Sequence, residues 1–229
     1  MRSLGRRLAV EFIGTAFLLL AVVGAATTAA RLGASPAIGL LASAITVGGV
    51  LAALIAALGT VGDAHFNPAV SLGAVLLGHL PVSEAVPYAF AQVAGGVLGV
   101  VVAHAGFGDP LLSISDMPRA GAGAFVAETV ATAGLVAFIF LLVRAGRQAS
   151  VGAAVGAFVA GAHLFAASTG FANPAVTLAR VFTGSPAGID PGSVWVFLAG
   201  EVLGSLVAVW WVWSLSPVDR RAQPSRIIP

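Results

Sequence analysis

Two short segments, residues 67–77 and 173–182, decide the fold of this chain. They read NPAVSLGAVLL and NPAVTLARVF. Each opens with an asparagine that can cap a helix and a proline suited to the first helical position, which together are a strong signal for a helix start. Each apolar segment is only about half of the ~20 residues that a membrane-spanning helix needs. We therefore expect two half-length, re-entrant helices, because such backbone is tolerated at membrane depth only where protein or an aqueous cavity surrounds it.

The rest of the chain is typical of a membrane domain. Of its 229 residues 59% are hydrophobic and 9% are charged, whereas soluble domains carry about 25% charged residues. This composition excludes an ordinary soluble domain, and its apolar content excludes a disordered chain. The sequence contains no cysteine, so it offers no disulfide or thiol chemistry. Apolar runs predict spanning helices over residues 8–30, 37–58, 82–105, 124–143, 150–168 and 193–214.

The order of elements repeats within the chain. Glu11 opens the first span and Glu128 lies in the fourth, while Gln92 in the third span corresponds to Glu201 in the sixth. Three spans per half is an odd number, so the two halves must have opposite topology, and such inverted repeats place the functional path at their shared interface. The predicted fold is one all-α membrane domain over residues 1–229, with six transmembrane helices and two half-helices, the repeats being 8–105 and 124–214.

The arginines predict the orientation. All 11 basic residues are arginine, and they lie at segment ends without forming a stripe, which argues against nucleic-acid binding. By the positive-inside rule we expect both termini in the cytoplasm of a bacterial-type inner membrane, with a cytoplasmic tail over 215–229. The first run resembles a signal peptide, but its length and Glu11 favour a retained helix. The eight arginines on the cytoplasmic side are Arg2, Arg6, Arg7, Arg144, Arg147, Arg220, Arg221 and Arg226.

Opposite topology makes the half-helices enter from opposite faces, so that their N-termini meet near the membrane centre. Each N-terminus carries roughly half a positive charge, which repels cations. The side-chain amides of Asn67 and Asn173 can donate hydrogen bonds into the same space. This combination is typical of a pore for neutral solutes that excludes ions. We expect no enzymatic activity, no cofactor and no metal.

The paired motifs resemble those of the aquaporin and glycerol-facilitator family, the major intrinsic proteins. The resemblance runs from Glu11 to the last helix and rests on AHFNPAV at 64–70 and NPAV at 173–176. It implies a homotetramer in membrane lipid with one pore per subunit. Within the motifs it implies pore-lining roles for Asn67, Pro68, Ala69, Asn173, Pro174 and Ala175. It also implies that Glu11 and Glu128 support the half-helices by accepting hydrogen bonds from the loop backbones.

The expected selectivity filter departs from the family pattern. Family members nearly always carry arginine right after the second motif, where this chain has Val176. The remaining filter positions are expected at Val47, at Gly161 or Ala162, and at Phe171 or Gly170, which gives a wide, largely apolar and uncharged opening. This pattern resembles a bacterial subgroup associated with arsenic handling. The favoured solutes are therefore trivalent arsenic acid and glycerol, and the alternative is water.

The sequence gives several other polar residues two alternative roles each. His65 lines the cytoplasmic mouth or braces its loop, and His163 faces the pore or packs inside. Arg180, four residues after Val176, either takes part of the missing arginine's role from the outer vestibule or extends to lipid headgroups. The correspondence of Glu201 with Gln92 favours a helix contact for Glu201 over a functional role. Rival functions are an ion-coupled secondary transporter, which would need one of the buried glutamates at its site, and a non-conducting scaffold.

Overall fold

The computed structural model describes residues 3–216. Four of the arginines that orient the chain (Arg2, Arg220, Arg221 and Arg226) and residues 217–229 of the expected tail lie outside this range. Within residues 3–216 six helices are long and apolar enough to cross a membrane, as predicted. They are α1 (Leu4–Arg31), α2 (Pro36–Leu58), α4 (Val82–Phe107), α5 (Ala122–Arg144), α6 (Val151–Phe165) with the 3-10 turn Gln148–Ser150 before it, and α8 (Val194–Leu215) with the 3-10 turn Pro191–Ser193 before it.

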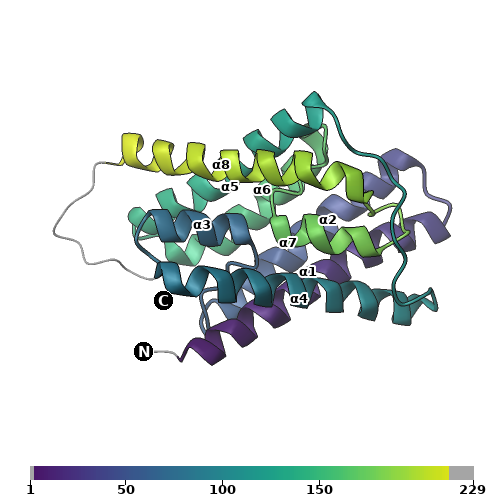
Figure 1. The fold of residues 1–229 in the computed structure, drawn as a ribbon, viewed down its shortest axis with the longest axis horizontal. Helices are drawn as coiled ribbons and strands as arrows, with labels where there is room; N and C mark the ends of the chain where they lie inside the picture. Colours follow the sequence, from purple (N-terminus) through teal and green to yellow (C-terminus); the bar gives the residue numbers. More distant parts are fainter. Residues whose placement is uncertain (1–2, 217–229) are drawn as a thin grey trace.

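The two half-helices form where the asparagine-proline pairs predict them. They are α3 (Pro68–Leu76) and α7 (Pro174–Ala179), and α7 continues as a 3-10 turn over Arg180–Phe182. In Figure 1, α3 and α7 lie on opposite sides of the molecule with their starting ends toward its middle. The fifth span ends three residues before the predicted boundary, because a turn from Ala166 to Thr169 leads the chain back toward α7.

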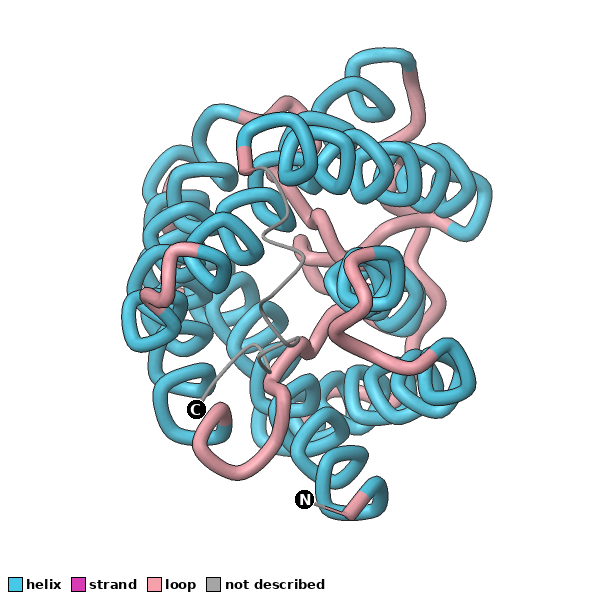
Figure 2. The backbone as a smooth tube through the Cα atoms, turned by 90° about the vertical axis from the view of Figure 1, so that its left-hand side faces the viewer, coloured by secondary structure: helices cyan, strands magenta, loops and turns pink. Residues whose placement is uncertain are grey.

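Helix pairing follows the inverted repeat. Helix α1 packs against α4, as α5 packs against α8, while α2 and α6 pack against each other across the two halves. Seen along the molecule, the long helices lie around a central region that loops cross (Figure 2), and Asn67 and Asn173, which precede α3 and α7, are buried. The starts of α3 and α7 are therefore held inside protein, away from lipid, as backbone at membrane depth requires.

The contact between α2 and α6 depends on two glycines that face each other. A Cβ atom on Gly48 would lie 2.5 Å from the carbonyl oxygen of Gly156 and 2.9 Å from the Ala160 Cβ. A Cβ on Gly156 would meet the carbonyl of Gly48 in return. Small residues at this crossing let the two backbones approach closely, which is how helices associate in lipid.

We expect Gly48→Ala to destabilise the protein, because its methyl group overlaps the α6 backbone, at a cost of about 1–3 kcal/mol. Gly49 is the matched control, since a Cβ there has nothing within 4 Å and alanine is the better helix former. Melting temperatures of both variants in detergent test this. Equal melting temperatures for Gly48→Ala and Gly49→Ala would contradict the close approach of α2 and α6.

Candidate functional site

Asn67 and Asn173 cap the two half-helices. The Asn67 Oδ1 accepts from the Ala69 N–H at 2.8 Å. The Asn173 Oδ1 accepts from Ala175 at 3.0 Å and from Val176 at 3.3 Å. Pro68 and Pro174 take the first helical positions, where no backbone donor is needed, and Ala69 and Ala175 are buried behind them.

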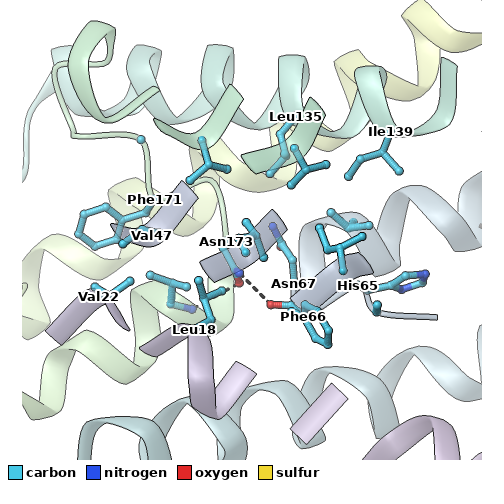
Figure 3. Close-up of a pocket in the computed structure, with 18 of the residues that line it drawn as sticks. Leu18, Val22, Val47, His65, Phe66, Asn67, Leu135, Ile139, Phe171 and Asn173 are labelled. Atoms are coloured by element: carbon cyan, nitrogen blue, oxygen red, sulfur yellow. Dashed lines mark hydrogen bonds between the residues drawn. The ribbon is translucent and has the colours of Figure 1, made fainter. Parts of the chain in front are cut away.

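Each asparagine also reaches across to the other half. The Asn67 Nδ2 donates to the Ala172 carbonyl at 2.7 Å, and the Asn173 Nδ2 donates to the Phe66 carbonyl at 2.8 Å (Figure 3). An amide nitrogen carries two hydrogens, so each Nδ2 keeps a second one for another acceptor. Both asparagines line the same cavity, which brings two donors together at the start of two helices.

The loops before the asparagines share an unusual backbone. Ala64 and Phe66 have φ of 51°, and the equivalent residues Gly170 and Ala172 have φ of 59° and 48°. Left-handed backbone of this kind costs an L-residue about 1–3 kcal/mol and persists only where its surroundings impose it. It turns the N–H groups of each loop away from the carbonyls of its own chain.

Glu11 and Glu128 accept those N–H groups. The two Glu11 carboxylate oxygens lie 2.9 Å from the His65 nitrogen and 2.6 Å from the Phe66 nitrogen. Glu128 repeats the arrangement with the two residues before Asn173, at the same two distances. Both glutamates are fully buried. The structure therefore places them where the expected half-helix support requires them.

Two further buried polar residues complete the supports. The Gln92 Nε2 donates to Glu11 at 2.8 Å and to Ser71 at 3.1 Å. On the other side Glu201 accepts from the Asn173 N–H at 3.1 Å and from the Thr177 hydroxyl at 2.6 Å. Glu201 thus goes beyond the expected helix contact, because it holds the backbone of a pore asparagine.

A cavity runs past the asparagine pair. His65 lies at one end, Asn67 and Asn173 lie in the middle, and Phe171, Val47 and Val22 lie toward the other end (Figure 3). Within the described residues, no aspartate or glutamate lines it, nor do three metal-ligating side chains gather anywhere. Its remaining walls are mostly apolar and include Leu18, Leu51, Ile55, Leu135, Ile139 and Val155.

A second cavity adjoins the first beyond Phe171. Val22, Val47, His163 and Arg180 line both cavities, and this shared set is called the neck below. It is the part of the path where side chains from α1, α2, α6 and the end of α7 converge.

The neck contains part of the expected filter. Val47 belongs to it, and Gly170, Phe171 and Val176 line the first cavity beside it. Gly161 and Ala162 line neither cavity, which corrects the position expected on α6.

His163 takes the α6 position at the neck. The expected position lies one or two residues before it on α6, on the side that the loop before Asn173 covers. Ala162 instead packs on that loop, where a Cβ on Gly170 would come within 2.8 Å of the Ala162 Cβ. The His163 Nδ1 donates to the Val159 carbonyl at 2.9 Å. A carbonyl can only accept, so Nε2 is left as an acceptor.

Arg180 lies deeper than the sequence suggests. Its side chain is 6% exposed, its Nε donates to the Ala187 carbonyl, and its guanidinium carbon lies 3.4 Å from the centroid of the Phe171 ring. Helical side chains lean toward the N-terminus, so a long side chain one turn beyond Val176 extends back along the path. Arg180 therefore adds a charge at the neck itself, which the expected uncharged filter lacked and which a vestibule position would not give.

The His65 end is held by an ion-pair network. The His65 Nδ1 lies 3.0 Å from the Ser71 hydroxyl, and nearby Asp63 bonds to Arg7 at 2.7 Å and accepts from the Tyr88 hydroxyl at 2.5 Å. Burial raises the pKa of Asp63, but the bond from Tyr88 and the charge of Arg7 outweigh it, so the pKa lies below its ordinary value. The loop that carries His65 is thus fixed at this end of the cavity.

Together the fold and the site define a membrane channel with a path between two capped half-helices. The major intrinsic protein family model matches residues 2–212, and the chain belongs to this family of membrane channels. It is 41% identical over 226 residues to aquaglyceroporin AqpS of Rhizobium meliloti (strain 1021), with 97% of each chain covered.

Other relatives agree with this assignment. The chain is 31% identical over 226 residues to a glycerol uptake facilitator protein of Streptococcus pneumoniae, covering 87% of this chain and 94% of the relative. The X-ray structure of the aquaglyceroporin from Plasmodium falciparum superposes with a TM-score of 0.76 at 23% identity, covering 91% of this chain and 95% of the other. That likeness confirms the fold.

We expect Glu11→Gln to destabilise the protein by about 2–3 kcal/mol, because glutamine offers one acceptor oxygen where two N–H groups point and turns an amide toward the other. Asp109→Asn is the control, since it removes an exposed ion pair with Arg31 worth at most about 1 kcal/mol. Thermal unfolding in detergent measures both. Equal melting temperatures for Glu11→Gln and Asp109→Asn would mean that Glu11 does not hold the loop before α3.

Proposed function

We propose that this protein is a passive channel for small neutral hydroxylated solutes, with glycerol and trivalent arsenic acid as its favoured substrates. One observation carries the proposal: Asn67 and Asn173 meet in a single cavity, each at the start of a half-helix and each with an amide hydrogen left to donate. A hydroxyl oxygen of the solute can accept hydrogen bonds from both amides at this point, while the carbon atoms of a polyol pack against the apolar walls.

Charge at this point favours neutral solutes. Each half-helix start contributes roughly half a positive charge, and Arg180 adds a full one at the neck. A cation loses its hydration in the path and meets positive charge of the protein in return. A neutral polyol exchanges its water hydrogen bonds for those of Asn67, Asn173 and the neck.

The relatives support glycerol, since one is a glycerol uptake facilitator and another an aquaglyceroporin. Trivalent arsenic acid is neutral at pH 7 and carries three hydroxyl groups like a polyol, so the same donors suit it. Val47 in the neck and Val176 beside it are small side chains, which leaves room for a polyol along these two walls. Water is the alternative substrate, because a single file of water needs less room than a polyol.

An ion-coupled transporter is less well supported. Its coupling acid would have to be reached from the path, yet Glu11, Glu128 and Glu201 line neither cavity. Each of them already accepts backbone N–H groups. They hold the loops from behind the walls of the path.

The setting of the channel completes the proposal. We infer from the arginine distribution that both termini lie in the cytoplasm, which puts His65 at the inner mouth and Arg180 on the outer side. By analogy with the family, we infer a homotetramer in the inner membrane of a bacterium, one pore in each subunit, acting without a cofactor or enzymatic step.

Flux through purified protein in liposomes tests this function. We expect glycerol and trivalent arsenic acid to cross far faster than in protein-free liposomes, in proportion to their gradient and without response to an imposed pH gradient. Planar-bilayer current should stay at baseline. Saturable, proton-dependent flux would favour the transporter, and permeability to water alone would favour the alternative substrate.

We expect Val176→Arg to raise the ratio of water to glycerol permeability. The new guanidinium fills part of the first cavity beside the neck and offers hydrogen-bond donors that water can use. Val176→Thr, close to valine in shape, is the control and should keep the ratio. Stopped-flow light scattering on folded protein measures both rates. A ratio that stays equal or falls would show that Val176 does not limit the path.

A further inference from the structure

The second cavity contains two arginines close together. Arg119, in the segment between α4 and α5, and Arg180 both line it. Their guanidinium carbons lie 5.5 and 3.4 Å from the centroid of the same Phe171 ring. Two like charges so near to each other in a partly buried place repel strongly, because little water screens them.

One turn of backbone holds both guanidinium groups. The Arg119 Nε donates to the Gly188 carbonyl at 2.6 Å and its Nη2 donates to the Pro186 carbonyl at 2.8 Å. The Arg180 Nε donates to Ala187, the residue between them. Three successive carbonyls thus fix the two side chains in place but supply only dipoles, which do not neutralise two full charges.

The terminal nitrogens of Arg180 remain open to the cavity. Within residues 3–216, Nη1 and Nη2 make no hydrogen bond to protein, and they are not among the polar atoms sealed from solvent without a partner. Arg180 as a residue is 6% exposed and lines the cavity. A buried cation therefore presents unused N–H donors to the cavities that it lines, a costly arrangement unless a ligand compensates it.

No carboxylate of the described chain supplies that compensation. Neither cavity is lined by an aspartate or glutamate. Glu128 interacts electrostatically with Arg180, but its two oxygens are occupied by the Phe171 and Ala172 N–H groups. The space in front of the two guanidinium groups is therefore positive, and no carboxylate of the described residues faces it.

We propose that Arg119 and Arg180 form a binding site for a small oxyanion such as inorganic phosphate. A guanidinium presents parallel N–H donors that match two oxygens of such an anion, and these charge-assisted bonds are the strong ones. Because Arg180 belongs to the neck, an anion bound there stands in the solute path. The bound oxyanion therefore obstructs the channel from the Arg180 side, so that anion concentration regulates neutral-solute flux.

Binding is tested on the full chain purified in dodecyl maltoside, a detergent without phosphate. Sodium phosphate should raise the melting temperature saturably above that in sodium chloride of equal ionic strength. Arg119→Gln, in a connecting segment outside the spans, should abolish this shift, and Arg180→Gln should do the same. Arg31→Gln is the matched control and should keep it, since Arg31 pairs with Asp109 outside the cavity.

Regulation is tested in phosphatidylcholine liposomes, and this arm rests on the proposed function. Phosphate at its dissociation constant should lower wild-type glycerol flux roughly twofold by occupying half of the channels, with no such effect on Arg119→Gln. A phospholipid headgroup carries the same chemistry. If it is the natural ligand, phosphatidic acid in the liposomes should lower wild-type flux without added phosphate, and again not that of Arg119→Gln.

The two arms separate the two proposals. No phosphate shift in the wild type, or the same shift in both arginine variants, overturns the anion site whatever the flux. Liposomes that pass no glycerol overturn the proposed function, while the melting shift still decides the anion site. If Arg180→Gln does not fold, Arg119→Gln alone gives the same test.

Discussion

Two buried carboxylates, each holding a pair of backbone N–H groups, support the rest of the structure. Glu11 and Glu128 accept hydrogen bonds from two loops. The left-handed backbone of these loops leaves their N–H groups without an acceptor inside the loop. Water cannot satisfy these groups inside a membrane, where an unpaired donor costs several kcal/mol. The same turn that directs the Phe66 and Ala172 N–H groups to the glutamates leaves their carbonyls for the opposite asparagines. The position of both half-helices, and hence of the path, follows from this pairing.

The two halves agree in their supports and differ at the two ends of the path. Caps, crossed amides and paired N–H bonds recur on both sides with nearly equal distances. Gln92 and Glu201 already differ, since only Glu201 also holds the backbone of the asparagine. The difference is largest at the mouths, which carry a histidine tied to Ser71 on one side and two arginines over Phe171 on the other. Symmetric elements hold the path open, and asymmetric ones make its two ends chemically different.

The features readable from sequence are those whose chemistry is local. Asparagine before proline predicts a capped start wherever it occurs, so α3 and α7 could be predicted from the residues alone. The roles of Glu11 and Glu128 come from the resemblance to the family. The neck is predictable only in part, because it depends on how far side chains reach. Val47 is expected there, whereas the sequence leaves open whether His163 faces the pore, and Gly161 and Ala162 line neither cavity. Arg180 takes its place because a long side chain extends back along its helix.

The crossed amide bonds also bear on how the chain is made. Asn67 bonds to Ala172, 105 residues later, and Phe66 accepts from Asn173, 107 residues later. A contact so distant in sequence forms late, because the chain between must first be ordered. During synthesis the loop before the first half-helix therefore lacks its hydrogen bonds to the second half. It gains them only when the second half-helix has formed beside it. The two halves mature together, so a chain stopped after the first half should lack a finished pore loop of its own.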